Sequence, residues 1–268
     1  MNYNELFSKL WADYTSKNPQ ALKIYDSFIA EGEKVINDHI AFRTFNLPEV
    51  NIDVLSKAFL AAGFEEKGSY VFEQKKLFAK HFEHPGIPDA PRVFISQLKV
   101  EEFSPYLQNV VKDIVSKVPQ EVINSSEIVL AGNQWGKPSY EVYQKLREES
   151  EYAAWLYVNG FTVNHFTVSV THLEKLNDIY AVNDFLKNQG YLMNDGAGEV
   201  QGTPEELLEQ SSVKAELKNI EFEEGIYQVP ACYYEFAKRY PDADGKLYSG
   251  FIAKSADKIF QSTDFYEK

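Results

Sequence analysis

The segment "NDHIAFRTF", Asn37 to Phe45, decides the fold, because it reads as a buried strand with two polar side chains on one side. Its apolar and aromatic residues favour an extended conformation. Residues two and four apart in a strand point to the same face, so His39, Ala41 and Arg43 lie together. Taken alone, a histidine or an arginine at such a position is more typical of a hydrogen-bonded structural residue than of a functional site. The rest of the chain decides between these interpretations.

The order of elements that begins with this strand occurs twice. A helix that ends at Gly63 comes next, and three strands follow in "SYVFEQKK", "LFAKHFEH" and "RVFISQLKV". After Gly160, the strand "FTVNHFTVSVTH" and the helix "LEKLNDIYAVNDFLKNQGY" precede three extended segments, "EVQGTP", "VKAELKNIEFEEG" and "IYQVPACYYEFAKRY". His39 lies 24 residues before Gly63, and His165 lies 25 residues before Gly190. The matching order and spacing indicate an internal repeat.

This repeat predicts an α+β fold, in which two βαβββ modules form a curled mixed sheet around a metal cleft, with added helices. Such a chain is one catalytic domain over residues 1–268, since neither module alone encloses the cleft. Four parts are expected: an N-terminal helical segment 1–34, module one 35–100, a helical insertion 101–158, and module two with the C-terminal segment 159–268.

Composition and charge limit the partners. The net charge is −13 and no cluster of lysine and arginine occurs, so nucleic acid is excluded as a partner. No stretch approaches the roughly 20 apolar residues of a membrane span. The single cysteine, Cys232, excludes a disulfide within the chain, and the N-terminus lacks the apolar run of a signal peptide. The cytoplasm is the expected compartment.

Pairing of the two modules predicts a metal site. Their first strands face each other across the cleft, which brings His39 and His165 together. A third ligand is expected from the last strand of a module, where Glu235 stands in an aromatic segment. Its counterpart in module one is near Gln97, a neutral and weak ligand. Two histidines and one carboxylate with open positions suit non-haem Fe(II) that handles dioxygen.

Arg43 is the candidate substrate anchor. It lies roughly 13 Å along the strand from His39, and its rigid fork matches a carboxylate. A small Ala41 between them leaves room for a ligand. A structural alternative stays open, in which Glu235 is a buried acid paired with Arg239 or Arg43.

Three other side chains with possible chemistry have simpler interpretations. His81 and His84 in "AKHFEHPG" are typical of a solvated strand end. Cys232 lies three residues from Glu235 and therefore on the opposite face of the strand, which favours a buried structural thiol.

Five segments together resemble a known family. They are "NDHIAFRTF", "PRVFISQL", "VNHFTVSV", "VPACYYEFAKRY" and "SGFIAKSADKIFQST". In this order they resemble the 2-oxoadipate dioxygenase/decarboxylases of bacteria and plants, and the resemblance covers about residues 36–263. That family is similar in architecture to the vicinal-oxygen-chelate superfamily.

The resemblance implies an Fe(II) enzyme that converts 2-oxoadipate and O2 to 2-hydroxyglutarate and CO2, a late step of lysine catabolism. It implies that His39, His165 and Glu235 are the Fe(II) ligands and that Arg43 binds the substrate carboxylate. The candidates that complete the substrate pocket near the C-terminus are Ser249, Gly250, Phe251 and Ser262.

Two other functions stay open from the sequence. One is another vicinal-oxygen-chelate enzyme, a lyase, isomerase or hydrolase, that uses Zn, Ni or Mn as a Lewis acid at the same ligands. The other is a non-enzymatic binding module with structural histidines.

Overall fold

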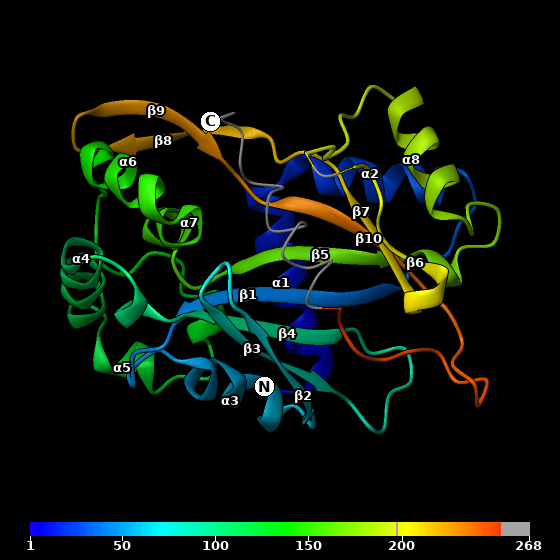
Figure 1. The fold of residues 1–268 in the computed structure, drawn as a ribbon, viewed down its shortest axis with the longest axis horizontal. Helices are drawn as coiled ribbons and strands as arrows, with labels where there is room; N and C mark the ends of the chain where they lie inside the picture. The colour runs from blue at the N-terminus through cyan, green and yellow to red at the C-terminus, as the bar shows by residue number, and fades with distance from the viewer. Residues whose placement is uncertain (197, 253–268) are drawn as a thin grey trace.

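The computed structural model describes residues 1–196 and 198–252, and an eight-stranded mixed sheet runs through its centre. The strand order is β2-β3-β4-β1-β5-β10-β7-β6 (Figure 1). β1 and β5 are antiparallel neighbours in the middle, and each is parallel to its outer neighbour, β4 or β10. The strands are β1 (Asn37–Phe45), β2 (Glu65–Phe72), β3 (Leu77–Glu83), β4 (Arg92–Leu98), β5 (Val163–Ser169), β6 (Gln201–Thr203), β7 (Leu208–Ser212) and β10 (Tyr233–Arg239).

Each half of the sheet is one βαβββ unit. The first is β1, α3 (Ile52–Ala61), β2, β3 and β4, and the second is β5, α8 (Ile179–Asn188), β6, β7 and β10. In both units the first strand lies at the centre of the sheet and the last strand pairs beside it. The predicted α+β fold with a curled mixed sheet is confirmed.

One strand of the second unit was predicted wrongly. The segment "VKAELKNIEFEEG" forms β8 (Leu217–Phe222), which pairs only with β9 (Gly225–Pro230) in a separate two-stranded sheet. Its place in the main sheet belongs to β7, whose sequence is LEQSS and whose residues are all buried. Polar residues do not give the apolar pattern of a strand, whereas β8 alternates visibly between exposed and covered positions.

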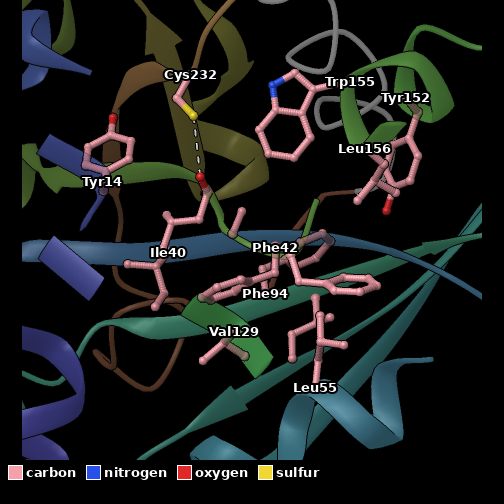
Figure 2. Packing of buried hydrophobic residues seen from close by; sticks show 14 of the residues in the cluster. Tyr14, Ile40, Phe42, Leu55, Phe94, Val129, Tyr152, Trp155, Leu156 and Cys232 are labelled. Atoms are coloured by element: carbon pink, nitrogen blue, oxygen red, sulfur yellow. Dashed lines mark hydrogen bonds between the residues drawn. The ribbon is translucent and has the colours of Figure 1, made fainter. Parts of the chain in front are cut away.

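The two faces of the central strands differ in chemistry. Even-numbered side chains face helices: the Trp11 ring of α1 packs 5.0 Å from Phe166 of β5, and Phe59 of α3 packs 5.4 Å from Phe42 of β1. Figure 2 shows Phe42 in this core, with Ile40 of β1 and Leu55 of α3 nearby. Odd-numbered side chains therefore face the other side, where His39, Arg43 and their partners lie.

Helices gather around the sheet (Figure 1). Those of residues 105–159 lie at one end, and the last of them, α7, is capped by Ser150, whose side chain accepts a hydrogen bond from Ala153 N. Gly160 caps its other end, where a Cβ atom would lie 2.1 Å from the carbonyl oxygen of Gly132. The remaining helices are α1 (Tyr3–Lys17), α2 (Pro19–Ala30), α4 (Pro105–Ser116), α5 (Gln120–Ile123), α6 (Tyr140–Glu149) and α7 (Glu151–Asn159).

Within the described ranges, no helix combines the length and the apolar character that crossing a membrane requires.

Candidate metal centre

Three side chains from three adjacent strands meet on the cleft face. His39 of β1, His165 of β5 and Glu235 of β10 each offer one ligand atom, and these atoms lie within 4.8 Å of one another. Nε2 of His39 lies 3.4 Å from Oε1 of Glu235, and Nε2 of His165 lies 3.4 Å from Oε2. All three residues are at least 95% buried. The structure thus brings together the three residues that the sequence singled out.

The ring of His39 is oriented by the residue before it. Its Nδ1 lies 2.8 Å from Oδ1 of Asp38, so Nε2 points into the cleft. Asp38 is itself held by Arg239, whose Nε and Nη2 donate hydrogen bonds of 2.7 and 2.9 Å. Burial alone would lower the pKa of His39, but contacts with Asp38 and Glu235 outweigh it and raise the pKa. The charges that favour a proton here also favour a metal cation.

His165 is oriented in the same way by Asn164, whose Oδ1 lies 3.0 Å from Nδ1 of the ring. The Tyr233 ring stacks on the imidazole, with the centroids 4.6 Å apart. Burial lowers the pKa of His165 to about 3, so the ring is neutral at physiological pH. A neutral imidazole with a fixed tautomer is the form that ligates a metal.

Glu235 has one oxygen satisfied and one open. Gln210 of β7 donates a hydrogen bond of 2.6 Å to Oε1, whereas Oε2 is buried and has no hydrogen-bond partner among the described residues. Burial raises the pKa of Glu235, but His165, His39 and Gln210 outweigh this effect and the net shift is downward. An ionised, buried oxygen without a donor is costly unless a cation binds it. The donor set therefore fits a divalent metal.

The first module contributes no carboxylate at the corresponding position. Thr167, two residues after His165, pairs with Glu235. Ala41, two residues after His39, pairs with Phe94. Phe94 is thus the counterpart of Glu235, and the expectation that Gln97 takes this place was wrong. Gln97 instead accepts a hydrogen bond from Ile52 N. A phenylalanine cannot ligate, so the triad leaves open positions for other ligands.

A small cavity adjoins the triad. Arg43 lines its far part and Phe94 and Phe251 line its wall, together with Ser96 and Tyr233. The full lining is His39, Ala41, Phe42, Arg43, Phe94, Ser96, Asn164, His165, Gln210, Tyr233, Glu235 and Phe251.

Arg43 is 1% exposed and is held by helix α7. Its Nη1 lies 3.2 Å from Oε1 of Glu151, and its guanidinium carbon lies 5.0 Å and 5.1 Å from the ring centroids of Tyr152 and Trp155. Burial alone would lower the pKa of Arg43, but Glu151 outweighs it and raises the pKa. The cleft thus presents a fixed positive charge at the end away from the triad.

One other predicted feature differs in the structure. His81 is not a solvated strand end: it is 3% exposed, with Nδ1 2.9 Å from the Tyr70 hydroxyl and Nε2 2.9 Å from Glu83 Oε1. The ring of His81 lies 5.5 Å from that of Phe251, which lines the cavity. Pro85 and Gly86, at the end of "AKHFEHPG", are exposed, and they made the whole segment look solvated. The burial of His81 depends instead on the C-terminal segment, since Phe251 packs against Tyr70 of β2 and His81 of β3.

The C-terminal candidates are placed unequally. Ser249 is exposed and lies beside Glu83, outside the cavity lining, so its substrate role stays a prediction. The carbonyl of Gly250 accepts a hydrogen bond of 2.7 Å from Arg239. Phe251 lines the cavity, with its ring 4.9 Å from that of His39. Ser262 lies outside the described residues.

Sequence reasoning missed the residues that orient the ligands. Asp38, Asn164 and Tyr233 were not singled out, although Asp38-His39 and Asn164-His165 are adjacent pairs at equivalent points of the repeat. This equivalent position before each histidine is the feature of the sequence that could have identified Asp38 and Asn164.

Comparison with known proteins places the chain in a family. Residues 3–243 match the 2-oxoadipate dioxygenase/decarboxylase family. The chain belongs to this family. A chloroplastic 2-oxoadipate dioxygenase/decarboxylase from Arabidopsis thaliana is 32% identical over 97% of this chain and 77% of that protein. The predicted membership of this enzyme family is therefore confirmed.

Solved structures agree with this assignment. Hydroxyglutarate synthase from Oryza sativa, in complex with 2-oxoadipate, is 31% identical, with a TM-score of 0.91 over 98% of this chain and 92% of that one. A protein from Shewanella frigidimarina NCIMB 400, provisionally named a hydrolase, is 47% identical, with a TM-score of 0.88 over 93% and 97% of the two chains. A glyoxalase-superfamily protein from Ralstonia eutropha JMP134 shares the fold, with a TM-score of 0.76 at 20% identity.

Proposed function

We propose that this family member is an Fe(II)-dependent dioxygenase that converts 2-oxoadipate and O2 to 2-hydroxyglutarate and CO2. The reaction balances, because the six-carbon acid loses its first carbon as CO2 and the five-carbon product gains both oxygen atoms of O2. The observation that carries the proposal is the buried His39, His165 and Glu235 cluster, whose Glu235 Oε2 has no donor within the described part of the chain. The rice relative, solved with 2-oxoadipate, supports the substrate.

The triad is proposed to hold Fe(II) through Nε2 of each histidine and the Glu235 carboxylate. Two histidines and one carboxylate with open positions are the donor set of non-haem Fe(II) oxygenases, and the bound metal would supply O2 chemistry and a chelation point for a 2-oxo acid. The chain itself supplies orientation: Asp38 and Asn164 fix the two imidazoles, and the buried cleft excludes water from the site.

Arg43 is proposed to bind the distal carboxylate of the substrate. It is buried, carries a fixed charge, and lines the same cavity as the triad. Its fork can donate to a substrate carboxylate as well as to Glu151, and stacking on Tyr152 and Trp155 restricts its motion. A substrate that is anchored at both ends binds in one direction only.

Oxygen uptake tests this function. The Fe(II)-loaded protein should consume O2 fastest with 2-oxoadipate, more slowly with its shorter and longer dicarboxylic homologues, and least with 2-oxohexanoate, which lacks the distal carboxylate. Stoichiometric iron with no oxygen uptake for any of these acids would overturn the proposal.

A metal-dependent hydrolase is the second candidate, because the Shewanella relative bears that name. The same three ligands would then hold a Lewis acid such as Zn²⁺. Metal analysis after anaerobic purification separates the two: tight zinc without oxygen uptake favours the hydrolase, and iron with oxygen uptake excludes it.

A further inference from the structure

The side chain of Tyr233 is buried and lines the cleft. The residue is 0% exposed and lines the cavity, and its hydroxyl oxygen has no hydrogen-bond partner among the residues that the structure describes. Leaving such a donor unsatisfied is unfavourable, so native proteins rarely do so without a reason such as an absent ligand.

Tyr234, the next residue, provides a comparison. Its hydroxyl is also buried and unpartnered within the described ranges, but its ring lies against Trp11 and Tyr14 of α1, on the helix side of the sheet. It does not line the cavity. Of these two phenols, only that of Tyr233 therefore points to a ligand, because only Tyr233 lines the cavity.

The strand register places Tyr233 level with His165, between the level of His39 and Glu235 and that of Arg43. Across the three central strands, His39 is level with Thr167 and Glu235. The next level on the cleft face holds Ala41, His165 and Tyr233.

Arg43 is two residues beyond Ala41 in the same direction. Tyr233 therefore stands level with His165 and one step beyond His39 and Glu235, in the direction of Arg43.

The position of Tyr233 is fixed from two sides. Its ring stacks on His165 at 4.6 Å, and its backbone carbonyl accepts a hydrogen bond of 2.5 Å from the Tyr14 hydroxyl. The phenol is an uncharged O–H donor. A neutral, preorganised donor binds an anion without repelling it.

We propose that the Tyr233 hydroxyl donates a hydrogen bond to the distal carboxylate of the substrate, and that Tyr233 and Arg43 together select dicarboxylic 2-oxo acids. This inference rests on the proposed function and extends it to a second residue that binds the distal carboxylate. We call Arg43 and Tyr233 together the carboxylate seat. Arg43 supplies the positive charge and the N–H donors of its guanidinium group. Tyr233 supplies an O–H donor from the second module. A monocarboxylic acid leaves the phenol unpaired and binds more weakly.

The test compares Tyr233→Phe with Tyr234→Phe, since each removes one buried phenolic oxygen. Tyr233→Phe should raise KM for 2-oxoadipate on the order of tenfold or more, because a hydrogen bond to a charged group is lost. Its kcat, its iron content and its KM for 2-oxohexanoate should change little. Tyr234→Phe should leave both KM values unchanged. An equal change of KM for the two acids in Tyr233→Phe, or no change for either, would overturn the inference.

Ligand binding without turnover separates this inference from the proposed function. Adipate carries two carboxylates and no oxo group, and hexanoate carries one carboxylate. Calorimetric titration of the Fe(II)-loaded protein without O2 should show that Tyr233→Phe weakens adipate about tenfold and leaves hexanoate unchanged. That result with an enzyme that consumes no O2 would retain the carboxylate seat and reject the dioxygenase. Equally weakened binding of adipate and hexanoate would reject the proposed carboxylate seat and leave the proposed dioxygenase function standing.

Discussion

Arg239 holds Asp38 by two hydrogen bonds of 2.7 and 2.9 Å, and Asp38 in turn holds the imidazole of His39. Arg239 also donates to the carbonyl groups of Tyr248 and Gly250, at 3.0 and 2.7 Å. One guanidinium therefore connects the segment that leads to Phe251 with the orientation of a metal ligand. Groups that orient ligands in this way typically affect metal affinity.

Asp38→Asn is expected to weaken metal binding on the order of tenfold or more, because the amide can no longer accept from Arg239 and His39 as a carboxylate does. The measurement is the dissociation constant for Fe(II) or a stand-in divalent metal, obtained by competition with a chelator. Asp53→Asn is the control, since Asp53 is exposed and forms an ion pair with Lys80. Unchanged affinity in Asp38→Asn would contradict the orienting role.

Glu235→Gln is expected to abolish stoichiometric metal binding, since it removes the only carboxylate of the triad. Glu209→Gln is the matched control, because Glu209 is another buried acid on an adjacent strand, where it accepts from the Tyr240 hydroxyl. Metal content by elemental analysis should fall in the first variant and persist in the second. Full metal content in Glu235→Gln would remove Glu235 from the ligand set.

Arg43→Ala is expected to raise KM for dicarboxylic substrates by tenfold or more and to leave bound iron nearly unchanged, because Arg43 lines the far part of the cavity. The measurement pairs iron analysis with oxygen uptake. Arg43 also forms an ion pair with Glu151, so Arg43→Ala alone changes the net charge of this part of the protein. The double variant Arg43→Ala with Glu151→Gln removes both charges and therefore separates an effect on folding from an effect on substrate binding. An equal loss of iron in both variants would assign Arg43 to the fold.

The fold was predictable because it depends on a repeated order of elements and on strand periodicity. His39, His165 and Glu235 stand on rigid central strands, so the repeat was sufficient to place them together. The error at Gln97 arose because a shift of pairing register exchanges the residues that face the cleft, and register depends on contacts between strands that one sequence does not contain. In the structure, the pairing of Ala41 with Phe94 fixes this register and makes Phe94, not Gln97, the counterpart of Glu235.

Other parts of the site depend on long-range contacts. Arg239 reaches Asp38 across 201 residues of sequence, and Glu151 reaches Arg43 from the helical segment. Burial of His81 depends on Phe251, which returns from the C-terminal segment. None of these contacts leaves a periodic signal. The strand β7 was missed for a related reason, since its polar side chains are buried through hydrogen bonds such as that of Ser211 to Asn183.

Cys232 is expected to be unreactive in the folded protein. The thiol is buried, donates to the Val163 carbonyl (Figure 2), and has its pKa raised by burial, so little thiolate forms at mildly alkaline pH. A colorimetric thiol reagent should react slowly with the native protein and at once after unfolding. Equal rates in the two states would show that the β10 strand opens to solvent.

Isotope labelling of the product tests the central claim most directly. The Fe(II)-loaded protein is supplied with 2-oxoadipate and isotopically heavy O2, and the 2-hydroxyglutarate is analysed by mass spectrometry. Because decarboxylation makes a new carboxylate and a new hydroxyl group on the same molecule, the account predicts product that carries both heavy oxygen atoms and CO2 that carries neither. Product with no heavy oxygen, or no 2-hydroxyglutarate from iron-loaded protein, would contradict it.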